Sequence, residues 1–89
     1  MNNNPLVSII IPHFNNYSII EECIYSIRNI KYNNIEIIVI DNGSTDNSIA
    51  KVQSKFLEVV IYQSAKNLGY AGGCNLGAGI AKGEYLFFL

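Results

Sequence analysis

Apolar residues come in short runs separated by polar loops, and the clearest run ends at an acidic residue. Residues 35–40 read Ile-Glu-Ile-Ile-Val-Ile, and every residue from Asp41 to Ser48 is small or polar. A nearly continuous apolar run is typical of a parallel strand covered by helices on both faces. Ligands of open α/β sheets bind just beyond the carboxyl ends of the strands. Asp41 and Asn42 are therefore candidate site residues.

Three further apolar runs predict strands over residues 7–11, 57–62 and 84–89. We expect Pro12 to end the first of them, because proline cannot donate to a strand ladder. We expect the aromatic side chains of the last strand to be core.

Helices are predicted between these strands from apolar residues three and four apart. The first covers about residues 18–30 and would begin with a capping box formed by Ser18 and Glu21. The second would be capped by Ser44 or Thr45.

A stretch dense in glycine, residues 71–81, predicts a short third helix despite the cost of glycine to helix stability. Gly73 and Gly77 would share one face of this helix. That spacing indicates close approach to the sheet or to a ligand.

The alternation of strands and helices predicts an α/β fold with a parallel, Rossmann-like sheet of about four strands and helices on both faces. Because crossovers are right-handed, the first two helices lie on one face if the sheet grows in one direction. A fourth strand at the free edge of the first would place the third helix on the opposite face. It would also create a switch point between strands one and four. This strand order is one of a few that the pattern allows.

Composition and net charge argue against some classes of function. The 89 residues are 49% hydrophobic and carry a net charge of -1, which is globular and offers no basic surface for nucleic acid. Cys23 and Cys74 are expected to be reduced and packed. The sequence has no signal peptide and no apolar run of membrane-spanning length, so we expect a soluble, cytoplasmic chain. Peripheral attachment at the inner membrane face is an alternative for the full-length protein. The three opening asparagines predict a disordered tail.

Several common site motifs are absent from the sequence. There is no P-loop, and the first strand is not followed by the glycines of a dinucleotide fingerprint. His13 is the only histidine, which argues against histidine-based metal hydrolases and catalytic triads.

Four segments together carry a resemblance. Residues 7–15 (VSIIIPHFN), 38–46 (IVIDNGSTD), 67–77 (NLGYAGGCNLG) and 83–89 (GEYLFFL) look like the start of a family 2 glycosyltransferase with the GT-A fold. The 67–77 segment resembles the Ala-Gly-Gly-x-Asn variant associated with rhamnosyl-type and galactofuranosyl-type transferases. Residues 1–89 would then be the N-terminal, nucleotide-sugar-binding part of such a domain.

The resemblance implies transfer of a sugar from a UDP- or dTDP-linked donor to an acceptor hydroxyl, with inversion, in cell-surface polysaccharide or glycoconjugate synthesis. The acceptor would be a saccharide or a lipid-linked molecule. The first strand's end would line the base pocket, and glycines would let the backbone approach the ribose or diphosphate. The residues it assigns to donor binding are Pro12, His13, Phe14, Asn15, Asp41, Asn42, Gly43, Asn67, Gly69, Gly72, Gly73 and Asn75.

The sequence departs from the family pattern at two site positions and at its end. Members often have aspartate at the position of Asn42 and tyrosine at that of Phe14. They place an acidic pair, which holds Mg²⁺ or Mn²⁺ against the diphosphate, directly after the strand that ends here at Leu89. Neither these ligands nor a general base is in this segment. We therefore expect donor binding only, no catalytic residue and no transfer by these residues alone.

Two other hypotheses remain open. One is a nucleotide-binding or regulatory module that performs no chemistry, and the other is a structural α/β interaction domain. Asp41 and Asn42 could simply cap the following turn, and His13 is more often a turn residue than a catalyst. We also expect exposed apolar surface and self-association through the sheet edge.

Overall fold

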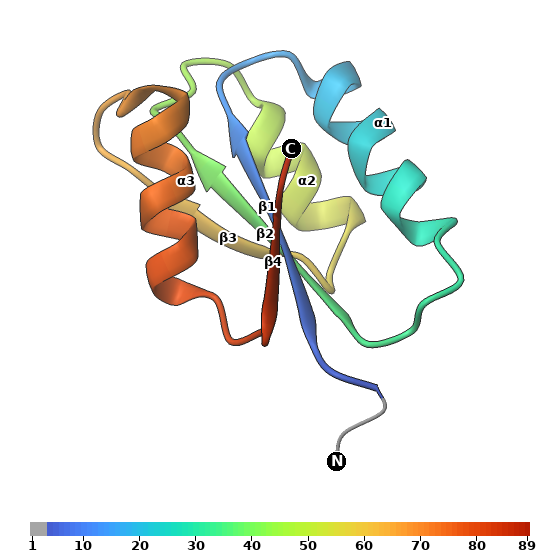
Figure 1. The fold of residues 1–89 in the computed structure, drawn as a ribbon. Coiled ribbons are helices and arrows are strands. Elements are labelled where there is room, and N and C mark those ends of the chain that lie inside the picture. Colours follow the sequence, from blue (N-terminus) through green and yellow to red (C-terminus); the bar gives the residue numbers. More distant parts are fainter. Residues whose placement is uncertain (1–3) are drawn as a thin grey trace.

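Strands and helices alternate along the whole of the computed structural model, which describes residues 4–89 (Figure 1). Of the predicted disordered tail, Asn2 and Asn3 lie outside these residues. The elements are β1 (Val7–His13), α1 (Tyr17–Arg28), β2 (Ile35–Asp41), α2 (Ser48–Lys55), β3 (Val60–Gln63), α3 (Gly69–Ile80) and β4 (Tyr85–Phe88).

The four strands form one parallel sheet in the order β3-β2-β1-β4. The fourth strand thus returns to the free edge of the first, which selects one of the orders that the sequence left open. Helices α1 and α2 cover one face of the sheet and α3 covers the other (Figure 1). The predicted α/β class, with helices on both faces and a switch point between β1 and β4, is confirmed.

The central strands β1 and β2 contribute to two separate cores, because alternate side chains point to opposite faces. Ile9 and Val39 pack with the buried faces of α1 and α2. Ile10 and Ile38 pack under α3, together with Ile40. This two-sided burial is the physical reason for the nearly continuous apolar run in β2.

Helix α3 lies close to the sheet through its glycines. A Cβ on Gly77 would lie 2.3 Å from Cγ2 of Ile10, and one on Gly73 would lie 3.0 Å from Cβ of Pro12. Both glycines are buried. The sequence-based expectation of close approach is confirmed, and the sheet is what they approach.

Strand β1 continues through Pro12 to His13, so the prediction that proline ends it was wrong. The carbonyl of Ile10 accepts a hydrogen bond from the backbone N–H of Leu89, which places the β4 side of the strand at this residue. Two residues later, the nitrogen of Pro12 points to the same side. Within residues 4–89, β4 pairs with β1 only as far as Phe88, so Pro12 removes no hydrogen bond from the ladder described here.

The predicted helix caps do not form. Helix α1 begins one residue before Ser18, whose hydroxyl bonds to the side chain of Asn16, while Glu21 bonds to Tyr17 and Lys55. Helix α2 begins at Ser48 because the residues expected to cap it bond to another loop.

The aromatic residues of β4 were expected to be core, and this was wrong. Tyr85, Phe87 and Phe88 are 59%, 62% and 44% exposed. The strand lies at the edge of the sheet, and among residues 4–89 no strand pairs with its outer side. The expectation of exposed apolar surface is confirmed at this edge.

A polar network near the starts of β1 and β2 holds the turn that leads from α3 into β4. The buried hydroxyl of Ser8 donates to Glu36 at 2.6 Å and accepts from the N–H of Gly83 at 2.8 Å. The N–H of Lys82 donates to the same carboxylate at 2.7 Å. These hydrogen bonds direct the residues that follow α3 to the side of β1 that β2 does not occupy.

Substitution of two glycines in α3 tests the close approach. Gly77→Ala should lower the free energy of unfolding by about 1–3 kcal/mol, because the added methyl group overlaps Ile10. Gly79 has no atom within 4 Å of an added Cβ, so Gly79→Ala should stabilise by up to about 1 kcal/mol through helix propensity. Urea unfolding of both variants measures the difference. Equal effects would contradict a tight helix-to-sheet contact.

Candidate functional site

Three loops meet at the carboxyl end of the sheet, beside the switch point between β1 and β4. The first loop (residues 14–16) follows β1, the second loop (residues 42–47) follows β2, and the third loop (residues 64–68) precedes α3. His13 pairs with Asp41 in register, and the N–H of Asn42 donates to the carbonyl of His13 at 2.8 Å. The structure therefore brings together the strand ends that the sequence singled out.

The first loop exposes an aromatic ring and turns sharply after it. Phe14 is 49% exposed. Asn15 and Asn16 both have a left-handed backbone, with φ of 53° and 69°, which asparagine tolerates better than most residues. The Phe14 ring is therefore accessible for stacking on a planar ligand.

Asp41 is buried at the end of β2, and its Oδ1 accepts a hydrogen bond from the N–H of Ser44 at 3.1 Å. The next turn passes through Gly43, whose φ of 79° suits glycine. The turn-capping role that the sequence allowed for Asp41 is thus present. Its backbone carbonyl also accepts from the N–H of Ser64 at 2.8 Å, which ties the third loop to β2.

Asn42 is also buried, and it too bonds to the third loop. Its Oδ1 accepts from the N–H of Leu68 at 3.3 Å, and its Nδ2 donates to the carbonyl of Gly69 at 3.1 Å. The backbone donor and acceptor fix which way the amide points. Asn42 thus attaches the start of α3 to the end of β2.

His13 turns away from the open edge and lies under the start of α2. Its Nε2 lies 2.9 Å from the hydroxyl of Ser48, which donates to Oδ1 of Asp46 at 2.6 Å. Since that hydroxyl proton points to Asp46, Nε2 is the nitrogen that donates to Ser48. Burial lowers the pKa of His13 below its usual value, and the charges of Asp41 and Asp46 oppose this shift. The neutral imidazole is therefore favoured, with its proton on Nε2.

Asp46 does not coordinate anything in this arrangement but accepts three hydrogen bonds. They come from the hydroxyl and backbone N–H of Ser48 and from the backbone N–H of Asn16. The two bonds from Ser48 are the main reason why the pKa of Asp46 is lowered. A carboxylate just before α2 also complements the helix dipole, although it lies outside the first turn of the helix.

The candidate residues on α3 and the third loop differ in how exposed they are to solvent. Asn67 and Asn75 are exposed, and Oδ1 of Asn67 accepts from the N–H of Gly69 at 2.7 Å. Gly72 lies against Leu68, where a Cβ would approach within 2.7 Å, while Gly73 faces Pro12 and Asn42.

Sequence reasoning missed the role of Ser44 and Thr45. The hydroxyl of Ser44 accepts from the N–H of Asn15 at 2.8 Å, and the N–H of Thr45 donates to Oδ1 of Asn15 at 2.9 Å. The signal was a pair of hydroxyl residues after a strand, which the sequence alone reads equally well as a helix cap.

Within residues 4–89, no three His, Cys, Asp or Glu side chains gather closely enough to hold a metal ion. The acidic pair that the resemblance implies for the divalent metal is expected after Leu89, outside these residues. In the same residues, no helix is both long and apolar enough to cross a bilayer.

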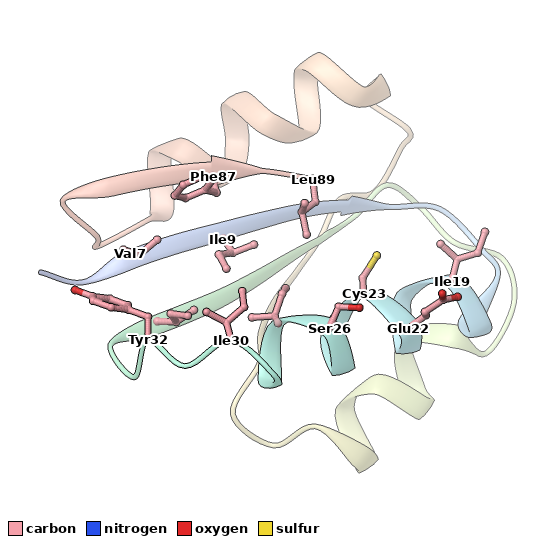
Figure 2. A pocket seen from close by; sticks show the side chains of 12 residues that line it. Val7, Ile9, Ile19, Glu22, Cys23, Ser26, Ile30, Tyr32, Phe87 and Leu89 are labelled. Carbon is pink, nitrogen blue, oxygen red and sulfur yellow. The ribbon is translucent and has the colours of Figure 1, made fainter. Parts of the chain in front are cut away.

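An apolar groove lies away from these loops. A groove of about 720 Å³ runs between α1 and the β1–β4 side of the sheet (Figure 2). Val7, Ile9, Ile27, Phe87 and Leu89 are among its apolar lining residues, and none of the candidate site residues line it. We place the site at the strand ends, because polar and backbone groups that can orient a ligand gather there.

The relatives of this chain are glycosyltransferases. A chain from Haemophilus influenzae described as an uncharacterized glycosyltransferase is 40% identical over 98% of this chain, which spans 36% of that relative's length.

Two solved structures are similar to the fold. A mannosyltransferase from Pyrobaculum calidifontis, solved with GDP-Man and Mn²⁺, matches 93% of this chain with a TM-score of 0.83 and 26% identity. S. aureus TarS 1-349, solved with UDP, matches 94% with a TM-score of 0.84 and 26% identity. This chain covers 26% of each of those chains.

Residues 8–89 match the sequence pattern of the family described as glycosyl transferase family 2. This match covers nearly the whole chain and agrees with the topology, the four sequence segments and the relatives. The chain belongs to glycosyl transferase family 2 and forms the N-terminal portion of its GT-A fold.

Proposed function

We propose that this chain is the donor-binding part of an inverting glycosyltransferase that uses a UDP- or dTDP-linked sugar. The observation that carries the proposal is the meeting of the β1 and β2 ends with the glycine-rich start of α3, beside the switch point. This is where open α/β sheets bind ligands. The complexes of TarS with UDP and of the Pyrobaculum mannosyltransferase with GDP-Man support a nucleotide-linked donor, and the choice of a pyrimidine base rests on the resemblance of the sequence segments.

Exposed groups at this edge would contact the donor. Phe14 would stack on the base, and Asn67 and Asn75 would offer side-chain hydrogen bonds. Gly69 and Gly72 would let the backbone come close to the ribose or diphosphate. Asp41 and Asn42 are both buried, so they would support the site from below its surface.

The acceptor would be a hydroxyl of a saccharide or of a lipid-linked molecule, used in cell-surface polysaccharide or glycoconjugate synthesis. The reaction would take place in the cytoplasm or at the inner face of the membrane. The acceptor oxygen would bond to the anomeric carbon while the bond to the diphosphate breaks on the opposite side, which inverts the configuration. The hydroxyl proton would pass to a carboxylate base. We assign no catalytic role to residues 4–89 and expect no transfer by them alone.

Mg²⁺ or Mn²⁺ would offset charge on the leaving diphosphate in the full-length protein. The Mn²⁺ complex of the Pyrobaculum mannosyltransferase supports divalent metal use by a similar protein. The ligands would come from residues outside this segment.

Removal of one aromatic ring tests nucleotide binding. Phe14→Ala should weaken UDP or dTDP binding about three- to tenfold, because an aromatic stacking contact contributes about 0.5–1.5 kcal/mol. Tyr85→Ala is the control, since Tyr85 is similarly exposed but pairs with Val7 at the other end of β1. Calorimetric titration of both variants gives the comparison. If the wild-type chain binds neither nucleotide, the structural interaction domain is the better hypothesis.

The coding sequence beyond Leu89 separates an enzyme from a binding module. We expect an acidic pair within the next few codons and a longer chain with a further carboxylate. Donor binding by that longer protein should then depend on Mg²⁺ or Mn²⁺. A stop codon after Leu89, or nucleotide binding that is unchanged by chelator, would instead favour a module without chemistry.

The outer edge of β4 should promote self-association of residues 1–89, because no strand of residues 4–89 pairs with that edge and its aromatic side chains are exposed. Light scattering should show oligomers that Phe87→Lys reduces to monomers. Leu57→Lys, at an exposed residue outside the sheet, is the matched control and should leave the oligomers intact. A wild-type monomer at high concentration would contradict this prediction.

A further inference from the structure

Two asparagine side chains at the candidate site bond to the backbone of neighbouring loops. Asn15 belongs to the first loop and bonds to the second, and Asn42 belongs to the second loop and bonds to the third and to the start of α3. The residues that each amide joins are between 26 and 31 positions apart in sequence. These two side chains therefore link three loops that the chain itself does not connect directly.

Asn15 acts mainly as an acceptor. Its Oδ1 receives the N–H of Thr45 at 2.9 Å and the N–H of Asp46 at 3.3 Å. Its Nδ2 makes only a longer contact, 3.4 Å to the hydroxyl of Thr45. The backbone N–H of Asn15 also donates to Ser44, and that of Asn16 to Asp46, so the first and second loops are joined at several points.

Asn42 acts as donor and acceptor at once. Its Oδ1 accepts from Leu68, and its Nδ2 donates to the carbonyl of Gly69. An added Cβ on Gly73 would lie 3.1 Å from Nδ2, so α3 closes over the amide. Asn42 is only 4% exposed, and a lost hydrogen bond here would not be replaced freely by water.

We propose that Asn15 and Asn42 are positioning residues, whose amides fix the spacing of the three loops and so set the shape of the nucleotide site. This inference rests on the proposed donor-binding function. Asn15 holds the loop that presents Phe14 against the loop that follows Asp41. Asn42 holds the glycine-rich start of α3 against the end of β2. Neither side chain needs to touch the ligand to affect its binding.

The different use of the two amides calls for a different substitution at each site. Asparagine and aspartate have nearly the same shape, but a carboxylate only accepts. Asn15→Asp therefore keeps the acceptor for Thr45 and Asp46. Asn42→Ala removes both the acceptor for Leu68 and the donor to Gly69. The first variant should preserve the contact between its two loops, and the second should release the start of α3 from the end of β2.

The experiment compares both variants with the wild-type chain by calorimetric titration with UDP and by amide hydrogen exchange without nucleotide. Asn15→Asp should leave exchange of the Thr45 and Asp46 amides within about twofold of the wild type, because the acceptor is retained. Asn42→Ala should weaken UDP binding about tenfold and speed exchange of the Leu68 amide by a similar factor. Unchanged Leu68 exchange in Asn42→Ala, or faster exchange at Thr45 and Asp46 in Asn15→Asp, would overturn the positioning role.

A third variant keeps the test valid if Asn42→Ala does not fold. Asn15→Gly retains the left-handed backbone and removes only the side chain. It should speed exchange of the Thr45 and Asp46 amides about tenfold and leave that of Leu68 unchanged. Unchanged exchange at Thr45 and Asp46 would overturn the inference for Asn15.

Failure of the proposed function gives a different result. If the wild-type chain binds no UDP, donor binding by this chain is contradicted, and the nucleotide-free exchange pattern still decides whether the two amides hold the loops.

Discussion

Pairing of β1 with β2 is the constraint on which the rest of the molecule depends. The register from Val7 with Ile35 to His13 with Asp41 presents alternate isoleucines to two cores at once. Because the strands are parallel, the same register brings both carboxyl ends to one edge. A shift by one residue would exchange the two faces and would also separate the site residues. Stability and site geometry therefore depend on the same hydrogen bonds.

The glycines of α3 lower the stability of that helix but let it lie against the sheet. At Gly77 the methyl group of an alanine would overlap Ile10, and at Gly73 it would crowd Pro12 and Asn42. Close packing keeps the start of α3 within reach of the Asn42 amide. Glycine, a poor helix former, therefore stands at the positions where α3 must lie close to β1 and to Asn42.

Most polar side chains beneath the candidate site bond within the protein. His13, Asp41 and Asn42 are all buried, and each bonds to a neighbouring loop or helix. Buried polar groups that are fully paired make a rigid and specific arrangement. An edge built in this way can hold its shape before a ligand binds, and the exposed ring of Phe14 and nearby backbone groups remain accessible. The groove beside α1 is lined mainly by apolar side chains, with Glu22, Ser26 and Tyr32 among its polar residues.

The sequence by itself determined the element order, the parallel α/β class and the identity of the strand ends, because apolar runs and helical spacing report burial directly. It also predicted a close approach by Gly73 and Gly77, to the sheet or to a ligand, and the structure shows that it is the sheet. Tertiary structure decided the position of β4, and with it the continuation of β1 through Pro12 and the exposure of Phe87. It also decided the partners of Ser44, Asn15 and Asn42. A short polar side chain can cap its own turn or bond to a distant loop at similar cost, and only the folded chain shows which donors and acceptors lie within reach.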